Sequence, residues 1–147
     1  MLRSLLMRQV AGQLPIVARV LRQQADAELA EFGVSNSMAW CLIYLDRLGQ
    51  DPRQAELAEA IGISGPSTVR VLDQLETSGL VERSPNPDDK RANRISITPK
   101  GAELLSKIEV RLSKLREAFF KDVSDEDMRI FHRVLSGLSD RILERRK

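Results

Sequence analysis

Hydrophobic residues recur every three or four positions in three long segments, one near the N-terminus and two near the C-terminus. This spacing gathers the hydrophobic side chains on one face of an α-helix, so we predict three amphipathic helices. The positions that define these faces are Val10, Leu14, Val17, Leu21, Ala25 and Leu29 in the first, Leu105, Ile108, Leu112, Leu115 and Phe119 in the second, and Met128, Phe131, Leu135, Leu138 and Ile142 in the third.

Polar residues mark where the two C-terminal helices begin. Ser124 can cap the last helix, with Asp127 three residues further on and able to complete the cap. Thr98 followed by Pro99 predicts the start of the preceding helix, because proline is tolerated at the first helical position.

Three shorter helices are predicted between these segments, over about residues 33–50, 53–61 and 64–77. The first has a hydrophobic stripe and a cap at Ser35 or Asn36; the stripe is Val34, Met38, Cys41, Leu45 and Leu48. In the second, Leu57, Ala58 and Ile61 are expected to face inward. Gly62 suits a tight turn, Ser64 can cap the third helix with Pro66 in its first turn, and Gly79 can end it.

The helix over 64–77 divides into two faces. Val69, Leu72 and Leu75 are expected to be buried, while the outward positions are Ser67, Thr68, Arg70 and Gln74. Hydroxyl, guanidinium and amide groups can bind phosphates or base edges in a DNA groove. Simple N-terminal capping is the alternative role for Ser67 and Thr68, and an ion pair or hydrogen bond with Asp73 or Gln74 is the alternative for Arg70.

Two short strands are predicted next, at residues 80–83 and 94–98, where Ile95 and Ile97 alternate with polar neighbours. The connecting tip, residues 84–93, carries Lys90 and Arg91, and Arg94 follows directly after it. Residues 83–100 contain five basic and two acidic side chains, a local charge of +3. A basic loop beside a helix-turn-helix can enter a minor groove, whereas an ordinary solvated hairpin is the alternative.

Composition narrows the function classes. Residues 53–100 hold seven basic and seven acidic side chains, so any case for DNA binding depends on where the charges lie. With one cysteine, Cys41, and one histidine, His132, neither an internal disulfide nor a transition-metal cluster is expected. No cofactor is expected, and the chain offers no nucleophile–base pair or glycine-rich phosphate loop, so we do not expect an enzyme.

The organisation of the chain favours a soluble, cytoplasmic protein that does not act at a membrane, since no hydrophobic run approaches the roughly 18 residues of a membrane span. We predict a mainly helical (α+β) fold, a winged helix-turn-helix with N- and C-terminal dimerisation helices. The expected divisions are 1–32, an N-terminal dimerisation helix; 33–99, a DNA-binding lobe; and 100–147, two C-terminal dimerisation helices. A monomeric bundle folded back on the central lobe is the alternative to a homodimer.

The segments AEAIGISGPSTVRVLDQLETSGLVER and DDKRANRISIT resemble the MarR family of bacterial transcriptional regulators, most closely its SlyA branch. The resemblance implies a homodimer that binds pseudo-palindromic sites in double-stranded promoter DNA as a repressor or antirepressor. It implies that Arg70 contacts the major groove, that Arg91 enters the minor groove, and that Asp89 braces Arg91. It also implies a small aromatic or phenolic effector, for which Trp40 is a candidate contact and ordinary helix packing the alternative.

The chain departs from the peroxide-sensing members of that family, which use a cysteine near the N-terminal helix. Cys41 lies instead on a hydrophobic stripe and is expected to be a buried core residue. His132 is expected at a surface or an interface. A winged-helix module that binds another protein remains the alternative function, and it would differ from a DNA-binding protein in having little dependence on salt.

Overall fold

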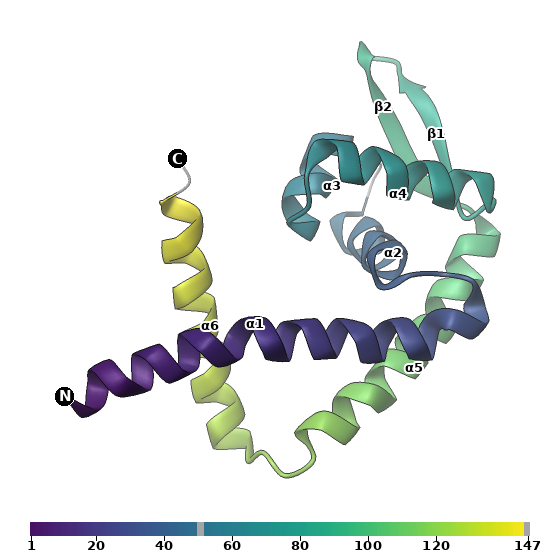
Figure 1. The fold of residues 1–147 in the computed structure, drawn as a ribbon. Coiled ribbons are helices and arrows are strands. Elements are labelled where there is room, and N and C mark those ends of the chain that lie inside the picture. The colour runs from purple at the N-terminus through teal and green to yellow at the C-terminus, as the bar shows by residue number, and fades with distance from the viewer. Residues whose placement is uncertain (50–51, 146–147) are drawn as a thin grey trace. The chain divides into compact units, whose positions relative to one another are not determined.

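The computed structural model describes residues 1–49 and 52–145, with the backbone alone for Asn86 and residues 89–93. The elements are α1 (Leu2–Leu29), the 3₁₀ turn η1 (Ala30–Phe32), α2 (Asn36–Leu48), α3 (Gln54–Ile61), α4 (Gly65–Thr77), β1 (Val81–Asn86), β2 (Asp89–Ile97), α5 (Pro99–Phe120) and α6 (Asp125–Glu144) (Figure 1). The fold is mainly helical with a small antiparallel sheet, which confirms the predicted fold class.

The chain divides into two compact units, Met1–Ser113 and Lys114–Lys147. The first contains α1 to α4, the β-hairpin and the first part of α5, and the second contains the end of α5 and α6. The sequence predicts a different division, into a DNA-binding lobe over residues 33–99 and dimerisation helices on either side of it. That division stays a prediction.

A hydrophobic core joins α2, α3 and α4, which all contact one another. Leu42 of α2, Leu57 of α3 and Leu72 of α4 are each fully buried, and Ile95 of β2 is also buried. Burying a leucine side chain stabilises a fold by about 1.5–3 kcal/mol relative to leaving it exposed. These contacts therefore fix the orientation of α4 and leave its other face free.

The predicted helix caps are confirmed. The side-chain oxygens of Ser35, Ser64 and Ser124 accept hydrogen bonds from backbone N–H groups three residues further on. The hydroxyl of Thr98 likewise accepts a hydrogen bond from the N–H of Gly101, at 3.0 Å, where α5 begins. Each cap satisfies a backbone donor that the first turn of a helix leaves without a partner.

The buried face of α4 differs by one step from the prediction. Val69 is 38% exposed, and the buried residues are Thr68, Val71, Leu72 and Leu75. These positions follow the i, i+3, i+4, i+7 pattern of one helical stripe, which accepts a threonine when its hydroxyl has a partner. The prediction failed because it ranked Val69 above Thr68 on hydrophobicity alone. Leu48, predicted to lie on the hydrophobic stripe of α2, is also exposed, whereas Val34, Met38, Cys41 and Leu45 are buried.

The two strands are longer than predicted and pair antiparallel, with Val81 opposite Ile97 and Arg83 opposite Ile95. The register shifts between Pro85 and Asn86, close to the turn. Residues 90 and 91 therefore belong to β2 and not to an extended loop. The hairpin projects beyond α3 and α4 in Figure 1, as a wing does.

Helix α1 is attached to the rest of its unit through its C-terminal end. Ala25 and Leu29 are buried, whereas most of the hydrophobic residues before them are exposed. Arg111 of α5 binds the carboxylates of Glu28 and Glu31, and its guanidinium lies 5.3 Å from the ring centroid of Phe32. The N-terminal turns of α1 therefore present a hydrophobic surface within the described chain.

The end of α4 and the start of α5 are joined at the base of the hairpin. The N–H of Thr98 donates to the carbonyl of Leu80 at 3.1 Å, and its hydroxyl donates to the carbonyl of Gly79 at 2.6 Å. Gly101 is buried there, and a Cβ at this position would overlap the Leu80 carbonyl oxygen and lie 2.9 Å from Cγ2 of Ile97. Only glycine permits this approach of α5 to the hairpin.

Gly101→Ala should therefore destabilise the protein by about 1–3 kcal/mol, the usual cost of forcing an extra carbon into a packed site. The measurement is urea unfolding at one fixed protein concentration, with Gly65→Ala as the control because no heavy atom lies within 4 Å of a Cβ there. Equal effects of the two substitutions would contradict this account of the junction.

Candidate nucleic-acid interface

Helices α3 and α4 form a helix-turn-helix. Gly62 ends α3 in the left-handed region, with φ of 76°, and its N–H donates to the carbonyl of Ala58 at 2.9 Å. Two residues later Ser64 caps α4. The left-handed glycine and the immediate cap make the turn short, and this brings α4 across α3 with one face left open.

The open face of α4 carries three of the predicted binding residues. Ser67, Arg70 and Gln74 are all exposed. Arg70 and Gln74 line a shallow hollow of about 440 Å³ that also includes Asp73 and Thr77. Among the described residues, no hydrogen bond or ion pair of Arg70 is found, so the alternative in which Asp73 or Gln74 holds it is not the observed state.

The prediction that Thr68 faces outward is wrong. Its side chain is 0% exposed, and its hydroxyl donates to the carbonyl of Ser64 at 2.9 Å. Ser67 is outward but also takes part in the cap, because its hydroxyl accepts a hydrogen bond from the Ser64 hydroxyl at 2.9 Å. Both residues therefore support the first turn of α4, and Ser67 alone can also reach a ligand.

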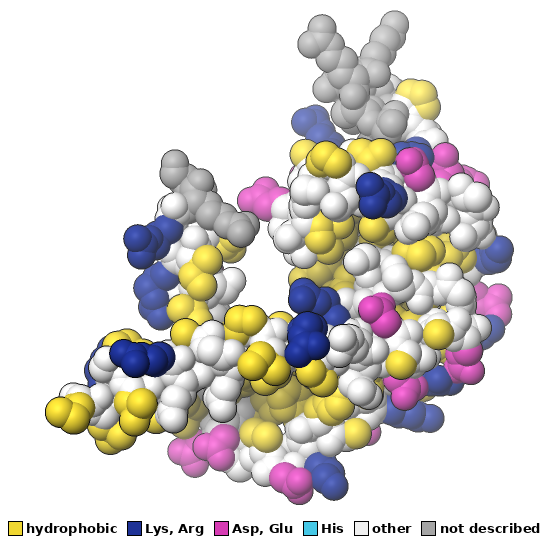
Figure 2. Space-filling model, viewed as in Figure 1, with side chains coloured by type: hydrophobic (Ala, Val, Ile, Leu, Met, Phe, Trp, Pro, Cys, Tyr) yellow, Lys and Arg dark blue, Asp and Glu magenta, His cyan; other side chains and the backbone are white. Residues whose placement is uncertain are grey.

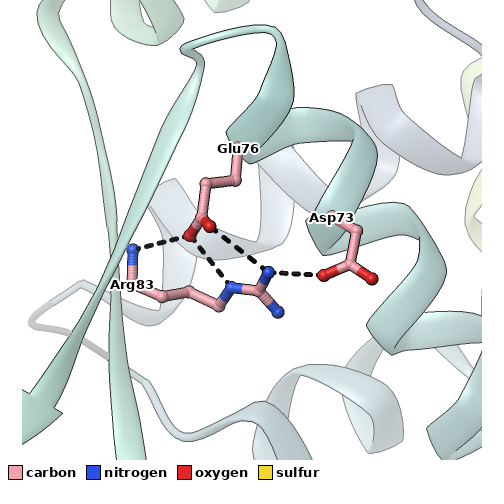
Figure 3. Close-up of polar contacts among 3 residues, drawn as sticks. All are labelled: Asp73, Glu76 and Arg83. Atoms are coloured by element: carbon pink, nitrogen blue, oxygen red, sulfur yellow. Dashed lines mark hydrogen bonds and ion pairs between the residues drawn. The ribbon is translucent and has the colours of Figure 1, made fainter.

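Arg83 of β1 binds two carboxylates of α4 (Figure 3). Its Nε lies 3.0 Å from Oε2 of Glu76, and one terminal nitrogen binds Asp73. The backbone N–H of Arg83 also donates to Glu76, at 3.3 Å. The hydrogen bond from the Arg83 side chain is the main reason why the pKa of Glu76 lies below its usual range.

This cluster is not among the features predicted from the sequence, where Arg83 appears only as part of the positive charge of residues 83–100. A signal was present: two carboxylates three positions apart on α4, followed after the turn at Gly79 by an arginine. Because Asp73 and Glu76 balance Arg83, this arginine adds no net positive charge to the wing.

The predicted wing residues lie on β2. Arg94 is half-buried and stands opposite Ser84 in the hairpin. The side chains of Asp89, Lys90 and Arg91 lie outside the described part of the structure. Their predicted roles stay predictions.

A separate cavity of about 340 Å³ includes Trp40. Trp40 and Tyr44 of α2 form one wall, with ring centroids 5.8 Å apart, and Arg22 of α1 brings a positive charge. Ile61 and Ile63, beside the helix-turn-helix turn, complete the hydrophobic part. The cavity thus joins α1 to the turn that positions α4.

Cys41 is fully buried in α2, as predicted, and burial raises the pKa of its thiol to about 12. A thiol in that state is a poor nucleophile at neutral pH.

His132 is exposed on α6, in line with a surface or interface position. Among the described residues, no group of three or more His, Cys, Asp or Glu side chains is placed to hold a metal ion. No helix in the described ranges is long and hydrophobic enough to cross a membrane.

A helix-turn-helix followed directly by a two-stranded hairpin defines the winged-helix class of proteins. A sequence model of the MarR family matches residues 32–92, which include α2 to α4 and most of the hairpin. The chain is 30% identical to the transcriptional regulator PA3341, with a TM-score of 0.83, over 92% of this chain and 98% of that one.

Two solved DNA complexes share the fold. A mutant of MarR from E. coli, complexed with operator DNA, is 19% identical with a TM-score of 0.81 over 88% of this chain and 93% of that chain. The MepR–DNA complex of S. aureus is 22% identical with a TM-score of 0.80 over 88% of this chain and 96% of that chain. These two likenesses show a shared fold. The family match and the relative PA3341 establish that the chain belongs to the MarR family of transcriptional regulators.

The Arg83 cluster generates a pH-dependent prediction. Glu76→Gln removes the negative charge and keeps the side-chain shape, so it should lower the free energy of unfolding at neutral pH. Because the pKa of Glu76 is lowered in the folded state, its stabilising effect is present above the usual glutamate pKa of about 4.3 and is lost as the pH falls through the lowered value. The difference between wild type and variant should therefore shrink to nothing in acid.

Urea unfolding of both proteins across this pH range provides the measurement. The matched control is Glu103→Gln, which removes an exposed ion pair with Lys107 on α5, with a distance of 3.0 Å between Nζ and Oε1. An exposed pair of this kind contributes about 0–1 kcal/mol. A Glu76→Gln effect that is the same at every pH would rule out the charge interaction as its cause.

Proposed function

We propose that this protein is a homodimeric, sequence-specific regulator that binds pseudo-palindromic promoter sites in double-stranded DNA. It would act in the cytoplasm, as a repressor or an antirepressor, by occluding the promoter or displacing another bound protein. The observation that carries the proposal is the open face of α4, where Arg70 and Gln74 are exposed beside a projecting hairpin.

The residue types on that face fit groove recognition. An arginine can donate two hydrogen bonds to guanine and a glutamine can bind adenine through its amide, while Ser67 can bind a phosphate. Helix α4 would lie in the major groove. The wing would place Arg91, with Lys90 and Arg94 nearby and Asp89 in support, at the adjacent minor groove, where narrow A·T-rich sequence attracts arginine.

The hydrophobic surfaces of the terminal helices support the homodimer. Exposed hydrophobic residues run along α1, where Figure 2 shows them on the surface, and they recur on α6. They include Leu2, Leu5, Leu6, Val10, Val17 and Leu21 on α1, and Ile130, Phe131, Val134, Leu135, Ile142 and Leu143 on α6.

A hydrophobic surface that is left in water costs about 25 cal/mol for each Å², so helices of this kind normally have a covering partner. A second copy of the chain would bring the same heptad-like stripes, and its helices would cover the exposed face of each terminal helix. Two DNA-reading lobes would then face two half-sites related by twofold symmetry.

A selection of bound sequences from random double-stranded DNA tests this function. We expect a palindrome whose half-sites lie about one helical turn, roughly 34–36 Å, apart. Arg70→Ala should weaken binding to the selected site by about 1–3 kcal/mol and relax the base preference at one position in each half-site. Binding should also weaken steeply with salt.

Lys107→Ala is the matched control, because it removes an exposed positive charge from α5, far along the chain from α4. It should leave the selected sequence unchanged. Recovery of no preferred sequence, or full binding by Arg70→Ala at physiological salt, would sink the proposal and favour the protein-binding module instead.

A small aromatic acid is the effector that we propose for the Trp40 cavity. The aromatic wall of Trp40 and Tyr44 can stack on a ring, and the guanidinium of Arg22 can bind a carboxylate. A ligand there would contact α1 and the residues beside the helix-turn-helix turn together, and could thus change how the lobe is held. This role for Trp40 rests on the cavity and on the family resemblance.

The chain has one tryptophan, so its fluorescence reports on this cavity directly. Titration with benzoate should quench the Trp40 emission, and Arg22→Gln should weaken that response about tenfold through loss of a charge-assisted hydrogen bond. Arg19→Gln, one turn away on α1, is the control. A benzoate response that is equal in both variants would show that Arg22 does not bind the carboxylate, and no quenching of Trp40 in the wild type would show that the acid does not bind in this cavity.

A further inference from the structure

We propose that Arg83 is a positioning residue for DNA binding: it fixes the wing to α4, the proposed recognition helix, so that the two elements enter their grooves as one rigid body. This inference rests on the proposed function. It assigns a role in recognition to a residue that faces α4 and is not expected to touch DNA.

The contacts of Arg83 are those of a clamp (Figure 3). The planar guanidinium uses Nε on Oε2 of Glu76, at 3.0 Å, and a terminal nitrogen on both Asp73 and Oε1 of Glu76, the latter at 3.4 Å. An arginine fork held by two carboxylates has far fewer orientations than an exposed single pair. The Arg83 side chain is only 19% exposed, so few water molecules can compete with the carboxylates for its N–H groups.

The backbone of β1 is held as well as the side chain. The N–H of Arg83 donates to Oε2 of Glu76 at 3.3 Å, so Glu76 binds both the strand and the guanidinium. A wing strand attached by its backbone cannot tilt while the side chain stays in place. The clamp therefore fixes the direction of the strand.

Because the clamp lies near the base of the hairpin, a small tilt of the strand at Arg83 produces a larger displacement at the tip. Leu80 and Val81 are buried at the base of the hairpin, whereas Ser84 and Pro85, just past Arg83, are exposed. The three residues from Arg83 to the turn span about 10 Å, so a tilt of about 10° at Arg83 would move the tip by about 2 Å. A displacement of that size breaks hydrogen bonds, which tolerate a few tenths of an ångström.

Simple charge balance is the competing explanation. Asp73 and Glu76 lie on the recognition helix, and without Arg83 their charges would repel DNA phosphates wherever the wing happened to be. The two explanations differ in whether the effect of an Arg83 substitution on DNA affinity depends on the contact that the wing makes with DNA. A positioning role predicts coupling to the wing, and charge balance predicts independence from it.

A double-mutant cycle on DNA affinity separates them, using the full-length protein and its selected site. We expect Arg83→Gln and Arg91→Ala each to weaken DNA binding about tenfold. If the two effects were independent, the double variant would bind about a hundredfold more weakly than wild type; we expect a clearly smaller loss of affinity. The equivalent cycle with Gln74→Ala should be additive, because Gln74 is on α4 itself. Gln74 is preferred to Arg70 because a released Asp73 could pair with Arg70.

Arg83→Lys provides the test of geometry against charge. Lysine keeps the positive charge but lacks the fork, so it should bind DNA nearly as weakly as Arg83→Gln. If Arg83→Lys restored wild-type affinity, or if the losses from Arg83→Gln and Arg91→Ala multiplied without coupling, charge balance would be the correct account and the positioning role would be overturned.

Two further outcomes are distinguishable. If Arg83→Gln fails to fold, the cycle is repeated with Glu76→Gln, which leaves Asp73 bound to Arg83, and the same criteria apply. If Gln74→Ala and Arg70→Ala weaken binding but Arg91→Ala does not, Arg91 makes no DNA contact that Arg83 could position, and the positioning role as tested by this cycle is wrong while DNA recognition by α4 stands. If none of these variants binds differently from wild type, the proposed function itself fails.

Discussion

The burial of one face of α4 is the constraint on which the rest of this structure depends. Thr68, Val71, Leu72 and Leu75 commit that face to the core formed with α2 and α3. Once it is committed, the helix cannot rotate, and Ser67, Arg70 and Gln74 are left on the opposite side. The burial of the hydrophobic face thus determines which polar side chains lie on the exposed face.

The local signals in the sequence predicted the elements well and their faces less well. Ser35, Ser64 and Ser124 lie at helix starts because a cap is a short-range interaction between a side chain and the next turn. The buried face of α4 depends on what other elements bring to it, and there the hydrophobicity of Val69 was misleading. Thr68 could take the core position because the Ser64 carbonyl accepts its hydroxyl, a contact that composition alone does not reveal.

The site shows the same division between local and non-local information. Arg70 and Gln74 could be placed from helical periodicity. The pairing of Arg83 with Asp73 and Glu76 could not, because it requires the chain to reverse at Gly79 and bring β1 back along α4. By sequence, residues 83–100 carry a net charge of +3, whereas in the structure one of those charges, on Arg83, is already balanced by Asp73 and Glu76 of α4.

Helix α5 begins at the hairpin and continues for 22 residues, about 33 Å, past the boundary between the two compact units. Its buried residues, Gly101, Leu105, Ile108 and Leu112, all belong to the first unit. A chimera that exchanges the DNA-reading lobe with a relative should therefore be joined after Ser113 and not at Pro99. The start of α5 would have to be exchanged with the lobe, because a lobe that ended at Pro99 would lose the helix that packs against the base of its hairpin.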